Sequence, residues 1–217
     1  MSYQLGDTVP APLADSVDPG TNILVSGPAM SGKRALMLEI LGHGARQGDG
    51  SVVVTANDGG AQIYREYREI APADEAYVRI IDSIGSTGNG DLEGIVESVS
   101  SPGDLTGMGI EFSQISKDAA GNGVDRIRVA FDSLSALLMY VDLERLFRFL
   151  HVFTRQIQSK DWIGMFAIDP DSHESKVINT LNQLFDGVFE IRVPDAGGRE
   201  IRARGFGNPP TEWVPLD

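Results

Sequence analysis

The segment Gly27-Pro28-Ala29-Met30-Ser31-Gly32-Lys33-Arg34 decides the fold of this 217-residue chain. It follows an apolar run at residues 22–26, typical of a buried strand, and leads into a helical pattern over residues 33–46. Glycines at this spacing let backbone N–H groups surround phosphate oxygens, while the helix start adds positive potential and Lys33 reaches the terminal phosphates. The segment therefore predicts a P-loop that binds ATP. The alternative is a glycine-containing turn with a chance lysine.

One position departs from the P-loop pattern. The motif has Ser or Thr after its lysine, and the hydroxyl of that residue binds Mg²⁺. This chain has Arg34 there. A guanidinium has only donors and cannot bind a cation, so Arg34 argues against ordinary Mg-dependent hydrolysis.

Two aspartates at strand ends are the candidate catalytic residues. Asp132 follows the apolar strand pattern of residues 126–131, where it is placed to hold Mg²⁺ through water beside the phosphates. Asp58 follows the strand pattern of residues 51–55 and is the candidate base that activates water. Its neighbour Asn57 can orient water but cannot take its proton. The alternative for each aspartate is a residue that stabilises a local turn.

Strand-length apolar runs alternate with helical patterns along the chain. They cover residues 22–26, 33–46, 51–55, 61–70, 77–82, 126–131, 143–158, 162–168 and 174–185. This order predicts a single α/β domain over residues 1–217, with a mainly parallel central sheet and helices on both faces. Residues 187–193 and 200–206 flank a turn and predict an antiparallel hairpin at the C-terminal edge. We expect residues 83–122, rich in Gly, Ser and Asn, to form an insertion with mobile edges and one helix capped by Asp104 or Thr106.

The net charge of −13, from 31 acidic and 18 basic residues, suits a highly saline cytoplasm, where salt screens repulsion between carboxylates. The alternative is an ordinary acidic cytosolic protein. The charge disfavours nucleic acid as a partner. No apolar run approaches the ~20 residues of a membrane span, and residues 1–20 lack the features of a secretory signal. We therefore expect a cytoplasmic protein with no membrane partner. The absence of cysteine excludes disulfides and thiolate metal sites.

The chain resembles the KaiC-like branch of the RecA superfamily of P-loop ATPases, in the small single-domain form found in halophilic archaea. The resemblance rests on the P-loop, on Phe131-Asp132-Ser133-Leu134-Ser135-Ala136-Leu137-Leu138, on Leu184-Phe185-Asp186-Gly187-Val188 and on Arg202-Ala203-Arg204-Gly205. It implies a RecA-like fold. In KaiC-like proteins a pair of glutamates after the second strand activates the attacking water. Asn57 and Asp58 stand at the matching positions here, so half of the pair is replaced.

The same resemblance suggests how the protein assembles. KaiC-like proteins carry a basic-x-Arg-Gly motif that, in ring assemblies, reaches the nucleotide of the neighbouring subunit. Arg202 and Arg204 match the placement of this motif, which implies a homo-oligomeric ring. The alternative is a charged edge strand that discourages pairing with other chains. KaiC-like proteins often act through partners, so the resemblance also implies a protein signalling partner.

Three functions follow from these features. The expected one is an ATP-binding regulatory or signal-transduction domain with weak or lost hydrolysis, because Arg34 and Asn57 change the catalytic positions while the phosphate-holding residues remain. The second is an active ATPase in which Asp132 and Asp58 suffice. The third is a DNA-recombination mediator, which the negative charge opposes. Its candidate binding residues are Arg145, Arg148 and Arg155.

Overall fold

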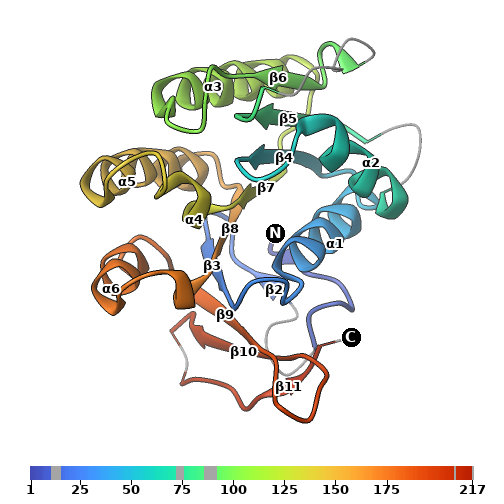
Figure 1. Cartoon of the computed structure of the whole chain (residues 1–217). Coiled ribbons are helices and arrows are strands. Elements are labelled where there is room, and N and C mark those ends of the chain that lie inside the picture. Colours follow the sequence, from blue (N-terminus) through green and yellow to red (C-terminus); the bar gives the residue numbers. More distant parts are fainter. Residues whose placement is uncertain (11–15, 72–75, 86–91, 208, 217) are drawn as a thin grey trace.

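A computed structural model describes residues 1–10, 16–71, 76–85, 92–207 and 209–216 of the chain. In this part, a central sheet has the strand order β11-β10-β9-β3-β8-β7-β4-β5-β6, with helices on both faces (Figure 1). The strands from β9 to β6 pair in parallel, and β9, β10 and β11 pair antiparallel. The expected fold class and the C-terminal hairpin are therefore confirmed. The strands are β3 (Asn22–Ser26), β4 (Gly50–Thr55), β5 (Val78–Asp82), β6 (Val96–Ser98), β7 (Ile127–Asp132), β8 (Ile163–Ile168), β9 (Gly187–Arg192), β10 (Glu200–Gly205) and β11 (Val214–Pro215).

The helices divide between the two faces of the sheet. One face is covered by α1 (Lys33–Ala45) and α2 (Gly60–Ile70) (Figure 1). The other is covered by α3 (Leu105–Gly121), α4 (Leu134–Leu137), α5 (Leu143–Ser159) and α6 (Ser175–Asn182). Among the described helices, none has both the length and the apolar character needed to cross a membrane.

Aromatic side chains fill the core beneath α3 and α5. The rings of Phe112 and Phe153 have centroids 4.2 Å apart, and those of Phe131 and Phe166 are 5.8 Å apart. All four side chains are buried. They come from two helices and two strands, so this core fixes α3 and α5 on the sheet.

The segment 83–122, which we expected to be an insertion, contributes to both the sheet and the core. β6 lies in parallel with β5 at the sheet edge. α3 begins at Asp104, whose carboxylate accepts a hydrogen bond from the Gly107 N–H at 2.8 Å, in agreement with one of the two expected caps. Residues 86–91 lie outside the described residues. The described remainder of the segment is built into the fold.

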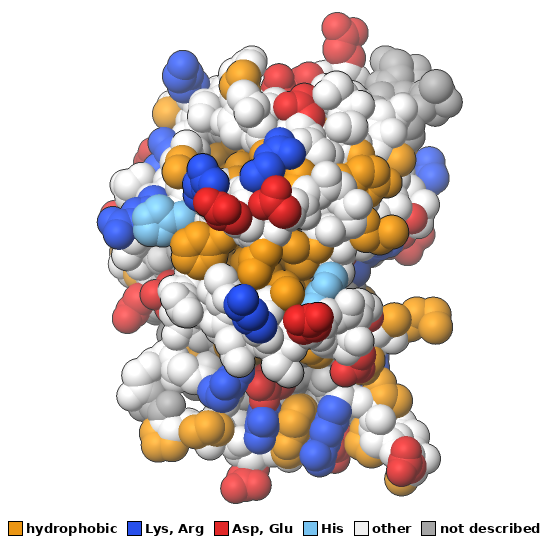
Figure 2. All heavy atoms as spheres, turned by 60° about the vertical axis from the view of Figure 1, so that its left-hand side comes forward, with side chains coloured by type: hydrophobic (Ala, Val, Ile, Leu, Met, Phe, Trp, Pro, Cys, Tyr) orange, Lys and Arg blue, Asp and Glu red, His pale blue; other side chains and the backbone are white. Residues whose placement is uncertain are grey.

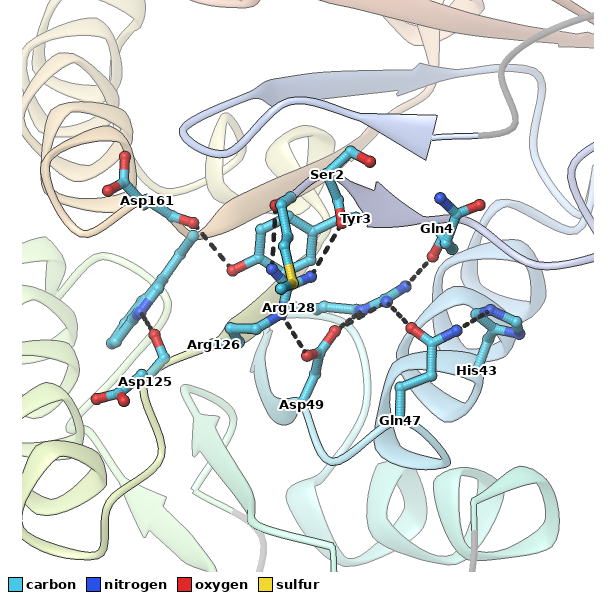
Figure 3. A network of polar contacts seen from close by, with 12 residues as sticks. Ser2, Tyr3, Gln4, His43, Gln47, Asp49, Asp125, Arg126, Arg128 and Asp161 are labelled. Atoms are coloured by element: carbon cyan, nitrogen blue, oxygen red, sulfur yellow. Dashed lines mark hydrogen bonds and ion pairs between the residues drawn. The ribbon is translucent and has the colours of Figure 1, made fainter.

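The N-terminal residues are held by Arg128 on β7 and by Arg126, just before this strand (Figure 3). Arg128 is fully buried and forms an ion pair of 2.8 Å with Asp49. Its Nη1 donates to the carbonyl oxygens of Gln4 (2.6 Å) and Ile40 (3.1 Å). Gln4 belongs to β1 (Tyr3–Gln4), which pairs with β2 (Ser16–Val17) in a separate two-stranded sheet. Arg128 therefore joins the N-terminal sheet to α1 and to the central sheet.

The carboxyl ends of four parallel strands meet at one edge of the central sheet. Register pairs Ser26 with Ile168 and Thr55 with Asp132, so β3, β8, β4 and β7 end at the same level. Residues that follow these ends converge there, which is the usual place of a ligand site in an open α/β sheet.

Candidate functional site

The glycine-containing loop between β3 and α1 has two residues in the left-handed backbone region. Gly32 has a φ of 87° and directly precedes α1, and Met30 has a φ of 57°. A Cβ at Gly27 would lie 2.7 Å from Ser31 Oγ and 3.0 Å from Ile191, so the loop is too tightly packed for a larger residue at this position. The loop closes against β8, where the Gly27 N–H donates to Ile168 O at 3.2 Å.

Lys33 is folded over this loop. Its Nζ donates to the carbonyl oxygens of Gly27 (2.7 Å) and Pro28 (2.6 Å). Burial lowers the pKa of the Lys33 ammonium, although the carboxylates of Asp169 and Asp132 raise it in opposition. The two carbonyl contacts hold the ammonium at the loop, where phosphate oxygens would compete for it.

Ser31 supplies an unused polar group in the same loop. Its side chain is buried, and its Oγ has no hydrogen-bond partner among the described residues. A buried hydroxyl without a partner carries a free-energy cost that a ligand oxygen could remove. Ser31, Gly32 and Lys33 line an open pocket of about 930 Å³, a size that suits a nucleotide.

The two candidate catalytic aspartates both bind the same guanidinium. Arg34 Nε donates to Asp132 Oδ2 at 2.5 Å, and its Nη2 forms a short ion pair with Asp58 Oδ2. Nη1 lies 3.5 Å from Glu66 Oε1 on α2. Burial opposes the charge on Arg34, but the carboxylates of Asp132 and Asp58 outweigh it and hold the pKa above its ordinary value. Arg34 therefore remains charged and joins α1 to β7 and to the loop after β4.

The side-chain amide of Asn57 donates to two side chains at the end of β7. Its Nδ2 donates to Ser133 Oγ at 3.2 Å and to Asp132 Oδ1 at 3.4 Å. Ser133 also caps α4, because its Oγ accepts from the Ala136 N–H. Asn57 is thus used as a donor to the end of β7.

The opposite wall of the pocket contains His173. His173 Nε2 lies 2.9 Å from Ser135 Oγ, and the same hydroxyl accepts from the Asp169 N–H at 2.9 Å. Asp169 caps the 3₁₀ turn η2 (Pro170–Ser172). Ser135 therefore ties the start of α4 to the loop after β8, and both line the pocket with Lys33.

Comparison with known proteins places the chain in a family. Residues 20–191 match the model of DUF7504, described as a family of unknown function. The chain belongs to this family. No curated protein matches it.

Two solved structures share the fold of this DUF7504 chain. The KaiC-like protein PH0186 from the hyperthermophilic archaeon Pyrococcus horikoshii OT3 has a TM-score of 0.70 at 14% identity, over 99% of this chain and 93% of that protein. The flagellar accessory protein FlaH from Methanocaldococcus jannaschii has a TM-score of 0.59 at 14% identity, over 96% and 89% of the two chains. The resemblance to KaiC-like proteins of the RecA type is therefore confirmed at the level of the fold.

The residues around Arg34 do not fit the Mg²⁺ that a P-loop implies. The position of the metal-binding hydroxyl is occupied by Arg34 itself, and the carboxylate of Asp132 is used by the guanidinium. In the described part of this DUF7504 chain, no three His, Asp or Glu side chains are grouped so that they could hold a metal ion. The Arg34 guanidinium therefore occupies the Asp132 carboxylate, which we expected to bind the metal.

The arginines expected to reach a neighbouring nucleotide lie on β10 and are paired within the chain. Glu190 on β9 accepts from Arg202 Nε at 2.5 Å and lies 3.1 Å from Arg204 Nη2. The Arg202 guanidinium also lies over the Trp213 ring, 4.6 Å from its centroid. Glu190 and Arg204 line a smaller cavity of about 250 Å³ together with Gly27. Glu190 and Arg204 therefore lie near Gly27, the first residue of the loop between β3 and α1.

The arginines on α5 lie on its exposed face. Arg145, Arg148 and Arg155 are all exposed, and Arg148 forms an ion pair with Glu144 one turn earlier. Basic and acidic side chains are interspersed on the face of the molecule that carries this helix (Figure 2). Such mixed charge weakens the attraction to a phosphate backbone.

Proposed function

We propose that this protein is an ATP-binding regulatory or signal-transduction domain in which hydrolysis is weak or lost. One observation carries the proposal: an intact phosphate loop stands beside an arginine that occupies both candidate catalytic carboxylates. The loop and the arginine have separate consequences, one for binding and one for chemistry.

The loop supports binding of a triphosphate. Backbone N–H groups at the start of α1 provide donors and positive potential for phosphate oxygens. Lys33 and Ser31 add an ammonium and an unused hydroxyl. Together with Ala29, Met30, Gly32 and Arg34, which line the same pocket, they are the residues expected to bind ATP. The open pocket leaves space for the rest of the nucleotide.

The ion pairs of Arg34 support the loss of hydrolysis. A base must accept a proton from water, and the Oδ2 of Asp58 is already occupied by the Arg34 guanidinium. Asn57, at the other position of the expected acid pair, is a donor to Ser133 and accepts no proton. Loss of a general base typically slows a reaction by about 10²–10⁴-fold.

Isothermal titration at high salt tests the binding. Wild type should bind ATP, and Lys33→Ala should bind it more weakly by at least about tenfold, because a charge-assisted contact is lost. The Lys160→Ala variant is the control, since Lys160 lies on the far side of the sheet at the end of α5. Absence of ATP binding by wild type, with and without Mg²⁺, would reject the proposal.

An active ATPase is the second candidate, and the position of Arg34 is the observation that favours it. A guanidinium next to the P-loop can stabilise charge that develops on phosphate during transfer. A phosphate-release assay at high salt separates the two functions. Turnover that disappears in both Lys33→Ala and Asp58→Ala would favour the enzyme.

We also propose that Arg202 and Arg204 serve a neighbouring copy of the chain. Their ion pairs with Glu190 hold two guanidinium groups near the P-loop. In a ring, these groups would be available to the nucleotide of the neighbouring subunit. A protein signalling partner is the other candidate ligand of Arg202 and Arg204. The acidic composition of the chain suits a saline cytoplasm. Sedimentation at high salt with ATP tests the ring: wild type should assemble, and Arg204→Ala should not.

A further inference from the structure

Arg34 lies where three acidic side chains from separate elements converge. Asp132 ends β7, Asp58 lies in the loop after β4, and Glu66 lies on α2. The guanidinium contacts the first two directly and lies 3.5 Å from the third. In the absence of Arg34, the carboxylates of Asp132 and Asp58 would lose their counterion beside the phosphate loop, and carboxylate oxygens are ligands that divalent cations prefer.

The guanidinium and a metal ion compete for the same oxygens. A cation bound by Asp132 would have to displace Nε at 2.5 Å, and one bound by Asp58 would have to displace Nη2. Displacement would leave a half-buried guanidinium without its partners, next to a second positive charge. Both effects oppose metal binding.

The guanidinium still has donors for a phosphate. Arginine has five N–H groups, and contacts to Asp132, Asp58 and Glu66 use at most three of them. Arg34 also lines the pocket with Lys33 and Gly32. Its planar shape matches two phosphate oxygens at once, which a spherical cation does not require.

We infer that the Arg34 guanidinium is a built-in substitute for the divalent cation, so that this site binds its nucleotide without metal. The inference rests on the proposed nucleotide binding and specifies the form of the ligand: the metal-free triphosphate. The charge that Mg²⁺ would bring to the phosphates is supplied by the chain and is held in place by Asp132 and Asp58 before the ligand arrives.

The test uses Mn²⁺ alone and ATP as two separate probes. Binding of Mn²⁺ is followed by electron paramagnetic resonance of the free ion, and ATP binding by titration in EDTA and in Mg²⁺. The variants are Arg34→Thr, which supplies the hydroxyl that the P-loop pattern uses, and Arg34→Lys, which keeps a positive charge. Circular dichroism checks that each variant is folded. Asp132→Asn in each background identifies metal bound at this site.

In wild type, Asp132→Asn should leave Mn²⁺ binding unchanged, and Mg²⁺ should alter the dissociation constant for ATP by less than about tenfold. Arg34→Thr should bind Mn²⁺, lose it on Asp132→Asn, and bind ATP at least about tenfold more tightly with Mg²⁺ than with EDTA. Arg34→Lys should bind no Mn²⁺ at this site.

Three results would overturn the inference. They are Mn²⁺ bound by wild type and lost on Asp132→Asn, tightening of wild-type ATP binding by more than tenfold with Mg²⁺, and a folded Arg34→Thr variant that gains no Mn²⁺. If neither wild type nor any of the variants binds ATP under any condition, the proposed function fails. The Mn²⁺ measurements still decide whether Arg34 excludes the metal.

Discussion

Neutralising Asp49 should destabilise the protein far more than neutralising an exposed acid of the same kind. Asp49 is 3% exposed and pairs with Arg128, which is fully buried, and with Arg126 at 2.8 Å (Figure 3). Asp49→Asn keeps the shape of the side chain but leaves the Arg128 charge buried without a counterion. Removing one partner of a buried pair costs about 3–5 kcal/mol. The melting temperature should therefore fall by about 6–20 °C, at about 2–4 °C per kcal/mol for a chain of this length.

Glu144→Gln is the matched control. Glu144 and Arg148 form an ion pair one helical turn apart, with side chains 78% and 70% exposed. Pairs of this kind contribute about 0–1 kcal/mol, because water and salt screen them. Urea unfolding, followed by tryptophan fluorescence and circular dichroism, gives the free energy of unfolding for each variant. If Asp49→Asn lost no more stability than Glu144→Gln, the argument from burial would be refuted.

Two further predictions test the N-terminal strand and the segment 83–122. Burial raises the pKa of the Tyr3 hydroxyl from 10.0 to about 12, so between these values the folded protein keeps a proton that the unfolded chain has lost. The stability of wild type relative to Tyr3→Phe should therefore be full well below pH 10 and about 2 kcal/mol lower at pH 12, as measured by urea unfolding at both ends of this range. If the difference in the free energy of unfolding between wild type and Tyr3→Phe were the same at both pH values, this prediction would be contradicted. Phe112→Ala should cost about 3–5 kcal/mol in the same assay, because the buried ring packs against Phe153 and Trp162; a cost below 1 kcal/mol would mean that α3 is detached from the core.

Much of the fold could be predicted because its strands and helices are long enough to carry a pattern. The apolar runs that became β3, β4, β5, β7 and β8 are five or six residues long and are buried almost throughout. The helical pattern of residues 143–158 became α5, where the buried residues Leu146, Leu150 and Phe153 recur at helical spacing. β6 has three residues and β11 has two, which is too short for any periodicity to be detected.

The sequence predicted individual residues of the site but not the contacts among them. The pattern identified Lys33, Arg34, Asp58 and Asp132, and the structure brings them to one edge of the sheet. Their mutual contacts depend on residues up to 98 positions apart, which local patterns do not encode. The same limit applies to Arg128, whose partner Asp49 lies 79 positions away and which interrupts an otherwise apolar strand. The contact of His173 with Ser135, 38 positions away, arises from the packing of two segments and is likewise absent from any local pattern.

The two arginine clusters tie the same pair of elements together at two separate places. Arg34 connects the start of α1 to the end of β7, and Arg128 connects the middle of α1, at Ile40, to the interior of β7. A metal-dependent P-loop gains its link between these elements when the metal and nucleotide arrive. Here the link exists in the chain beforehand, so the proposed nucleotide binding would have less structure left to create. A ligand shifts a conformational equilibrium only by its difference in affinity for the two states. The states that ATP could separate in this protein are therefore those in which Arg34 keeps or exchanges its contacts with Asp58 and Asp132.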